Sequence, residues 1–185
     1  MTTTPENLEN FKYRHIYSSQ TNHILYTSGN DGYLTCYDYR SNSIVSHARY
    51  EDDIIGLAPE IEGEVYNLAI GHKSGKISLI DFRKSGGSSN EEIVKEIDGH
   101  SRGSMTVIQG HQAAPIFATA TSSQVVKVWT SKGDQLGVVR PHTSILGQPI
   151  GPTKCLAFSP FSLKLASGGG DSICAVYSLE QIEQS

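Results

Sequence analysis

Histidine, serine and aspartate are the residues of this chain that could act in catalysis. Seven of the 185 residues are histidines, and Ser167 and Asp171 lie close together near the C-terminus. A Ser-His-Asp hydrolase places its serine on a strained turn beside an oxyanion hole, for which Gly-x-Ser-x-Gly is a usual pattern. This pattern does not occur in the chain. We therefore expect no catalytic activity.

The sequence also lacks the residue patterns that are usual for metal and phosphate sites. A zinc site needs His and Cys ligands at short spacing, and no such group occurs in the sequence. The three glycines at 168–170 precede a segment that reads as a strand, whereas a phosphate loop leads into a helix whose N-terminus binds the anion. We predict a tight turn at these glycines, and neither a metal nor a cofactor.

Cysteine usage and charge indicate the compartment and exclude some partners. Cys36, Cys155 and Cys174 each lie in an apolar run, which predicts three buried free thiols in a reducing compartment. The net charge is −4 and no run of Lys or Arg exceeds two residues, so nucleic acid is not expected as a partner. No signal peptide and no membrane span are predicted either. We expect a soluble, cytoplasmic protein.

Four segments share one pattern, a polar turn followed by an alternating strand. They are residues 29–40, 71–83, 121–133 and 168–180. The strands end at Asp38, Asp81, Thr130 and Ser178, which are separated by 43, 49 and 48 residues. A period of about 40 to 50 residues with such a strand end is typical of WD repeats, in which each repeat supplies one propeller blade of four strands.

This period predicts an all-β, partial WD-repeat propeller of about four blades. The expected blades are residues 11–51, 52–98, 99–141 and 142–180, with tails at 1–10 and 181–185. Residues 151–180 contain only three strand-like runs, so the last blade should lack its outer strand, which WD propellers typically borrow from their N-terminal end. A ring of seven blades needs about twenty-eight strands and this chain has about fifteen. In isolation it should therefore be poorly soluble, self-associate or unfold with low cooperativity.

WD repeats also carry a hydrogen-bonded structural set of four residues: a His before the first strand, a Ser or Thr, a turn Asp and a Trp in the third strand. In the last blade this set would be His142, Ser167, Asp171 and Tyr177. His100 and Trp129 would be half of a second set. We prefer this structural role to a catalytic one. The predicted structural markers of the repeats are Asp38, Asp81, Trp129, Tyr177, Asp171 and His142.

The C-terminal half resembles one family of WD propellers. Residues 93–180 are similar to the end of Raptor, the scaffold subunit of TOR complex 1, and in particular to its fungal members. Pro149 and Ser159 depart from the family, which usually has a basic residue and a histidine there. The residues that carry the resemblance are Leu146, Gly147, Gln148, Gly151, Cys155, Leu156, Ala157, Phe158 and Pro160, at the spacing of the family.

The resemblance implies a non-catalytic protein-interaction scaffold in TOR signalling and nutrient-dependent growth control. It covers only the last part of a seven-bladed propeller, so a fragment of a longer protein is expected. The implied partners are the TOR kinase and other TOR complex 1 subunits, and association with the vacuolar or lysosomal membrane would occur through them. The alternatives are an unrelated WD-repeat adaptor and, from another class, an enzyme built on a propeller.

An insertion between the third and fourth blades is the expected partner contact. It runs from Pro141 to Pro152, contains three prolines, and is too apolar for a purely solvated loop. It has two possible roles, which the sequence leaves open: to cover the propeller face, or to dock the propeller onto a TOR complex through Leu146 and Gln148.

Overall fold

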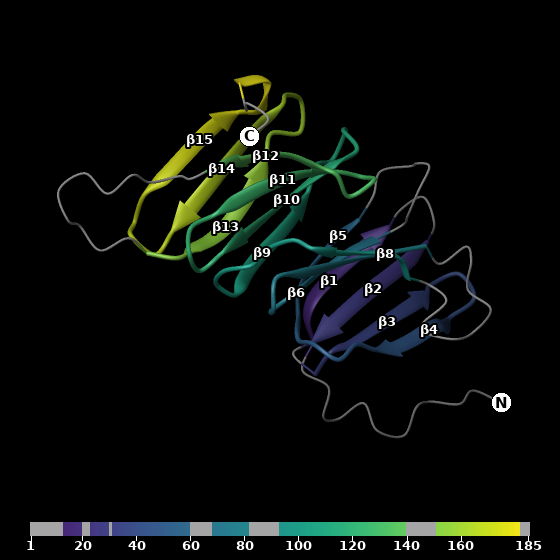
Figure 1. The fold of residues 1–185 in the computed structure, drawn as a ribbon. Helices are drawn as coiled ribbons and strands as arrows, with labels where there is room; N and C mark the ends of the chain where they lie inside the picture. The colour runs from purple at the N-terminus through teal and green to yellow at the C-terminus, as the bar shows by residue number, and fades with distance from the viewer. Residues whose placement is uncertain are drawn as a thin grey trace.

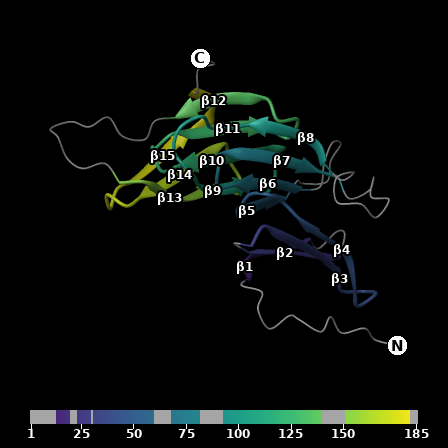
Figure 2. The ribbon, with the colours of Figure 1, turned by 60° about the horizontal axis from the view of Figure 1, so that its bottom comes forward.

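The chain folds into four antiparallel sheets that follow one another along the sequence (Figures 1 and 2). Sheets 1, 2 and 3 have four strands each, β1–β4, β5–β8 and β9–β12, whereas sheet 4 has only three, β13–β15. In every sheet the strands pair in chain order. This confirms the predicted all-β partial propeller of about four blades with an incomplete last blade. This computed structural model describes residues 13–19, 23–29, 31–59, 68–81, 93–139 and 151–181.

All fifteen strands are short, with five to seven residues each. A 3-10 turn, η3, follows the last described strand at Leu179–Gln181. The strand bounds are β1 Tyr13–Ser19, β2 Ile24–Gly29, β3 Tyr33–Asp38, β4 Ser43–Arg49, β5 Ile54–Pro59, β6 Leu68–His72, β7 Lys76–Ile80, β8 Ile93–Asp98, β9 Met105–Gly110, β10 Ile116–Thr121, β11 Val126–Thr130, β12 Gln135–Val139, β13 Thr153–Phe158, β14 Lys164–Gly169 and β15 Cys174–Ser178.

The third strand of each sheet ends where the repeat pattern predicts. β3 ends at Asp38, β11 at Thr130 and β15 at Ser178, whereas β7 stops one residue before Asp81. Gly32 shows why the turns before these strands are rich in glycine. Its φ is +75°, and a Cβ atom there would lie 2.5 Å from the carbonyl oxygen of Tyr50, so only glycine fits without displacing the backbone.

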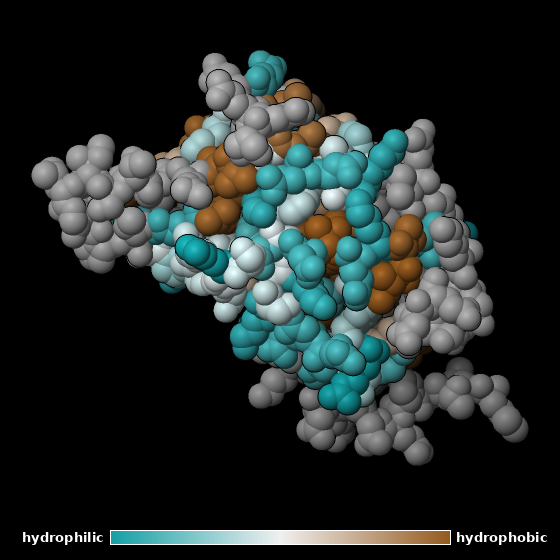
Figure 3. Space-filling view, viewed as in Figure 1, coloured by the Kyte–Doolittle hydropathy of each residue, from teal (hydrophilic) through white to brown (hydrophobic). Residues whose placement is uncertain are grey.

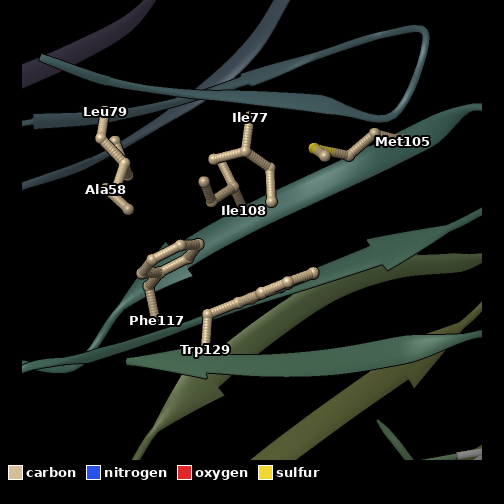
Figure 4. Close-up of a cluster of buried hydrophobic side chains, with 8 residues drawn as sticks. Ala58, Ile77, Leu79, Met105, Ile108, Phe117 and Trp129 are labelled. Atoms are coloured by element: carbon tan, nitrogen blue, oxygen red, sulfur yellow. The ribbon is translucent and has the colours of Figure 1, made fainter. Parts of the chain in front are cut away.

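The hydrophobic core lies between successive sheets, because alternate residues of each strand face opposite neighbours. Between sheets 2 and 3, Ile77 and Leu79 of β7 face Ile108, Phe117 and Trp129 (Figure 4). A second cluster joins sheets 1 and 2, and a third joins sheets 3 and 4. Contact between sheets runs mainly through the first strands β1, β5, β9 and β13. Each sheet is therefore stabilised chiefly by its neighbours.

The expectation of three buried thiols is right for Cys36 and wrong for Cys155 and Cys174, which are exposed. Cys36 packs in the cluster between sheets 1 and 2. Cys155 and Cys174 lie on the face of sheet 4 that points away from sheet 3, where no further described strand packs. The apolar runs were recognised correctly, but burial requires a neighbouring sheet on each side.

The described surface in Figure 3 is mostly hydrophilic and is interrupted by separate hydrophobic areas. Five of the exposed apolar residues lie in strands of the end sheets: Tyr13, Ile16, Ile44 and Val45 in sheet 1, and Val176 in sheet 4. Among the described residues, no helix has the length and apolar character needed to cross a membrane.

Candidate functional site

The most complete polar cluster of the interior lies in sheet 3, on the face towards sheet 2. Thr119 of β10 is fully buried, and its Oγ1 atom lies 2.7 Å from Nε2 of His100 and 2.8 Å from Nε1 of Trp129. The indole N–H donates to Thr119, and the hydroxyl can in turn donate to a neutral His100. Thr119 therefore joins the two residues that the sequence had identified as half of a set.

The electrostatics of this cluster favour a neutral histidine. Burial lowers the pKa of His100 to about 4, and the positive charge of Lys127 acts in the same direction. Burial also lowers the pKa of Lys127, whose ammonium lies 5.5 Å from the ring centre of Trp129. A histidine that is neutral, buried and hydrogen-bonded at Nε2 stabilises the sheet, and it is not accessible to a substrate.

A serine–histidine contact of the kind found in hydrolases occurs in sheet 2. Nε2 of His72 lies 2.9 Å from Oγ of Ser78. Burial lowers the pKa of His72, and the nearby negative charge of Asp52 opposes this shift. A serine nucleophile must be open to its substrate, but both Ser78 and His72 are buried. The contact satisfies two polar side chains inside the stack of sheets, and the sequence had not predicted it.

The set predicted for the last blade is seen only in part. Ser167 is buried, and its hydroxyl and that of Tyr177 form no hydrogen bond of ordinary length with any described residue. Burial raises the pKa of Tyr177, while the neighbouring Ser167 opposes the rise. Asp171 accepts a hydrogen bond from the backbone N–H of Ile173 at 3.1 Å. His142 lies outside the described residues, so the predicted set of four remains a prediction.

The polar residues at the ends of the third strands stabilise the turns that follow. The Asp38 carboxylate accepts hydrogen bonds from the backbone N–H of Arg40 at 2.8 Å and of Ser41 at 3.4 Å. The first of these bonds is the main cause that lowers the pKa of Asp38. Thr130 takes the same role in sheet 3, where its Oγ1 accepts from the backbone N–H of Asp134 at 3.1 Å.

Two further observations concern the charged groups near these ends. Asp81 is buried at 3% exposure. Arg40 forms an ion pair with Asp38 at 3.4 Å, and the arginine side chain is largely exposed. Solvent screens an exposed pair of this kind, so it is a minor surface contact.

His111 has a structural role that the sequence did not reveal. Its Nδ1 atom accepts hydrogen bonds from the backbone N–H groups of Ala113 and Ala114, both at 2.9 Å. Its Nε2 atom lies 3.4 Å from the carbonyl oxygen of Ser162 in sheet 4. The ring thus fixes the β9–β10 turn and links it to the β13–β14 turn. A single histidine at a predicted strand end carries no sequence signal for such a cap.

In the part of the chain that the structure describes, no three His, Cys, Asp or Glu side chains come together to hold a metal ion. Leu146 and Gln148, the predicted partner contact, lie outside the described residues. The geometry therefore consists of buried polar groups that hold a stack of sheets together.

Known proteins support this interpretation. The WD domain, G-beta repeat family matches residues 134–178. "Regulatory-associated protein of TOR 1" of Arabidopsis thaliana is 32% identical over 152 residues, which are 80% of this chain and 11% of that protein. "Target of rapamycin complex 1 subunit mip1" of Schizosaccharomyces pombe is 28% identical over 166 residues, 86% of this chain and 12% of that protein. The crystal structure of Chaetomium thermophilum Raptor superposes with a TM-score of 0.77 and 22% identity, over 95% of this chain and 16% of that one.

This chain is a WD-repeat segment of the Raptor family. The Raptor resemblance recognised in residues 93–180 is confirmed, and so is the WD-repeat fold. The chain spans about a tenth of the length of the curated Raptor relatives it matches. The superposition on the Raptor crystal structure shows a shared fold, whereas the relationship itself rests on the sequence identities.

Proposed function

We propose that this chain is a non-catalytic protein-interaction module that acts in TOR signalling. The observation that carries the proposal is the 32% identity to "Regulatory-associated protein of TOR 1" over 80% of the chain. WD-repeat proteins of the Raptor type are generally scaffolds. Three described serine or threonine hydroxyls contact a histidine. Those of Ser78 and Thr119 are buried within the stack of sheets, which suits packing and not turnover of a substrate, whereas that of Thr35 meets His47 at an exposed position.

The partners and location are part of the same proposal. The names of two relatives mention TOR or a target of rapamycin complex, so the TOR kinase and other TOR complex 1 subunits are the partners to test first. On this proposal the chain works in the cytoplasm and reaches vacuolar or lysosomal membranes only through its partners.

Affinity purification tests the proposal directly. A tagged copy of the 185-residue chain is expressed in the cells it comes from, and its partners are identified by quantitative mass spectrometry. A matched variant, Phe117→Asp, breaks the core between sheets 2 and 3 and serves as the control. We expect TOR complex 1 subunits to be enriched with the native chain over the variant. A reproducible set of partners without any TOR complex subunit would favour an unrelated WD-repeat adaptor.

The docking role of residues 141–152 needs its own test. A double variant, Leu146→Ala with Gln148→Ala, is compared with a control of the same composition, Leu163→Ala with Gln112→Ala, at exposed described positions. If the insertion is an interface, only the first variant loses TOR complex subunits, and its melting temperature stays unchanged. Loss of both association and thermal stability in that variant, or no loss of either, would mean that the insertion only packs on the propeller.

A further inference from the structure

Lys127 is a partly buried cation of sheet 3 that has no anionic partner among the described residues. It lies in β11, between Thr119 of β10 and Val138 of β12. Its ammonium lies 5.5 Å from the ring centre of Trp129, and no described carboxylate lies within ion-pair distance of it. A cation that is partly removed from water without a counter-ion is costly. The Lys127 ammonium is therefore suited to receive a carboxylate from another molecule.

Two more exposed lysines of sheet 2 are paired, in contrast to Lys127. Lys73 forms an ion pair with Asp53 at 3.2 Å, and Lys95 forms one with Asp134 at 3.6 Å. The second pair crosses from sheet 2 to sheet 3, because Lys95 lies in β8 and Asp134 in the β11–β12 turn. Asp134 is thus already bound by a lysine, and the outer part of the gap between the two sheets carries the positive charges of Lys95 and Lys127.

The acidic side chains of β8 do not face Lys127. Glu96 and Asp98 alternate with Ile97, and successive residues of a strand point to opposite faces of its sheet. Ile97 packs against the cluster between sheets 2 and 3, so Glu96 and Asp98 point away from sheet 3. The charge of Glu96 acts instead on His72. The gap beside Lys127 is therefore complementary to a negatively charged group.

β12 is the outer strand of sheet 3, and no described strand pairs with its free edge (Figure 2). Natural proteins place charged residues in exposed edge strands to prevent pairing with another chain. β4 contains Arg49, and β8 contains Lys95, Glu96 and Asp98. The sequence of β12, QLGVV, contains no charged residue. Of these three outer strands, β12 is therefore the one that is best suited to accept an added strand.

The register places Lys127 beside the middle of this edge. A bulge near the start of β12 leaves Gly137, Val138 and Val139 in regular pairing with β11, and the central residue, Val138, is opposite Lys127. In an added strand, the residue opposite Val138 would share the face of Lys127. Its Cα atom would lie about 10 Å from that of Lys127, because neighbouring strands are about 4.8 Å apart. A glutamate and a lysine side chain can together span this distance across a valine.

We propose that the free edge of β12 takes an extended segment of a partner protein as a fifth strand, and that an acidic side chain of this segment pairs with Lys127. The backbone hydrogen bonds of the added strand supply affinity, and Lys127 selects segments that carry a carboxylate. Sheets 2 and 4 pack on the two faces of sheet 3, so the free edge belongs to an interior sheet of the stack. The inference rests on the proposed role as a protein-interaction module and adds the kind of partner.

Binding of a synthetic peptide to the 185-residue chain tests the role of the charge. The glutamate probe is a short, fluorescently labelled peptide of alternating threonine and valine with a central glutamate, and the lysine probe has lysine in its place. We expect saturable binding of the glutamate probe, weakened about ten-fold or more by Lys127→Glu, since like charges then meet. The Lys127→Glu variant should bind the lysine probe instead, which would also show that the variant is folded.

Lys132→Glu is the matched control for the change in net charge, because Lys132 is exposed in the β11–β12 turn and lies outside the regular part of the β12 edge. Binding of the glutamate probe to this control should stay close to that of the native chain. No saturable binding of the glutamate probe to the native chain would overturn the proposal. An equal loss of binding in the Lys127→Glu and Lys132→Glu variants would also overturn it.

Methylation of the peptide backbone tests the strand addition itself. In an extended peptide, alternate N–H groups point to opposite edges, so methyl groups on one alternate set block pairing with β12 and those on the other set do not. We expect one of two such methylated glutamate probes to bind like the parent and the other to lose binding, whereas equal behaviour of the two would show that no edge is paired. These measurements need no TOR component, so their failure is distinct from a failure to enrich TOR complex 1 subunits in the affinity purification.

Discussion

Val128 in sheet 3 and Val176 in sheet 4 hold the same place in their sheets, each paired with an alanine of the second strand, Ala118 or Ala166. Val128 is 1% exposed because sheet 4 covers it, whereas Val176 is 66% exposed because no described sheet covers it. The strands themselves are alike in length and register. The comparison shows that a strand of this chain determines which residues share a face, and that only the next sheet determines whether the face is buried.

The largest contrast should come from two phenylalanines. Phe117 is buried between sheets 2 and 3, and Phe161 is almost fully exposed in the β13–β14 turn. Phe117→Ala leaves a cavity and should lower the free energy of unfolding by about 3 to 5 kcal/mol. Phe161→Ala should change it by less than about 0.5 kcal/mol. Urea unfolding of both variants checks this, and equal losses would mean that the two sheets do not differ in packing as described.

The next contrast concerns the polar residues at one register position, Thr119 in sheet 3 and Ser167 in sheet 4. Thr119→Val keeps the shape but leaves the indole N–H of Trp129 and the His100 ring without their shared partner, at a cost of about 1 to 3 kcal/mol. Ser167→Ala removes a hydroxyl that forms no hydrogen bond of ordinary length with a described residue, so stability should hold or rise slightly. A marked loss for Ser167→Ala would instead show that the predicted set with His142 forms.

The third prediction uses pH. In the folded chain the pKa of His100 is lowered to about 4, whereas in the unfolded chain it returns to about 6.5. Between these values only the unfolded chain binds the proton, so the free energy of unfolding should fall as the pH is lowered from about 6.5 to about 4. His72, whose pKa is also lowered, adds to the fall. In the His100→Gln variant the melting temperature should depend less on pH over this range, and an unchanged dependence would contradict the assignment.

The last prediction concerns the three thiols, for which we expect the smallest effect on stability and clear differences in reaction rate. Cys155 and Cys174 should react with a soluble thiol reagent without denaturant, and Cys36 should react only after unfolding. Peptide mapping after brief labelling gives the rate at each site, and three equal rates would contradict the burial described here.

Much of the fold follows from the sequence because it depends on short-range patterns. Alternation and turn residues located the ends of the third strands to within a residue of the marker positions, and the period of the repeat predicted separate sheets. The family was recognisable from residues 146–160. These signals lie within one strand or between neighbouring turns, and they do not depend on which sheets meet.

The interior contacts were harder to predict because they join different strands and sheets. In the sequence, Thr119 looks like any polar residue of an alternating strand. In retrospect it is distinguished by its position ten residues before Trp129 and, in the folded sheet, directly opposite Lys127. The role of His111 depends on the approach of the turn at Ser162 from another sheet. The exposure of Cys155 and Cys174 depends on a neighbour that no pattern within residues 151–180 can reveal.

Because the sheets contact one another mainly through β1, β5, β9 and β13, each sheet interacts chiefly with its immediate neighbours in the stack. In such a stack the cooperativity of unfolding depends on the contacts between neighbouring sheets. We expect a substitution in sheet 3 to change the stability of sheets 2 and 4 and to have less effect on sheet 1. On heating, sheets 1 and 4 at the two ends of the described stack should unfold first. Force applied to the termini would unfold the sheets one after another. A force–extension trace should therefore show several small steps in place of one large one.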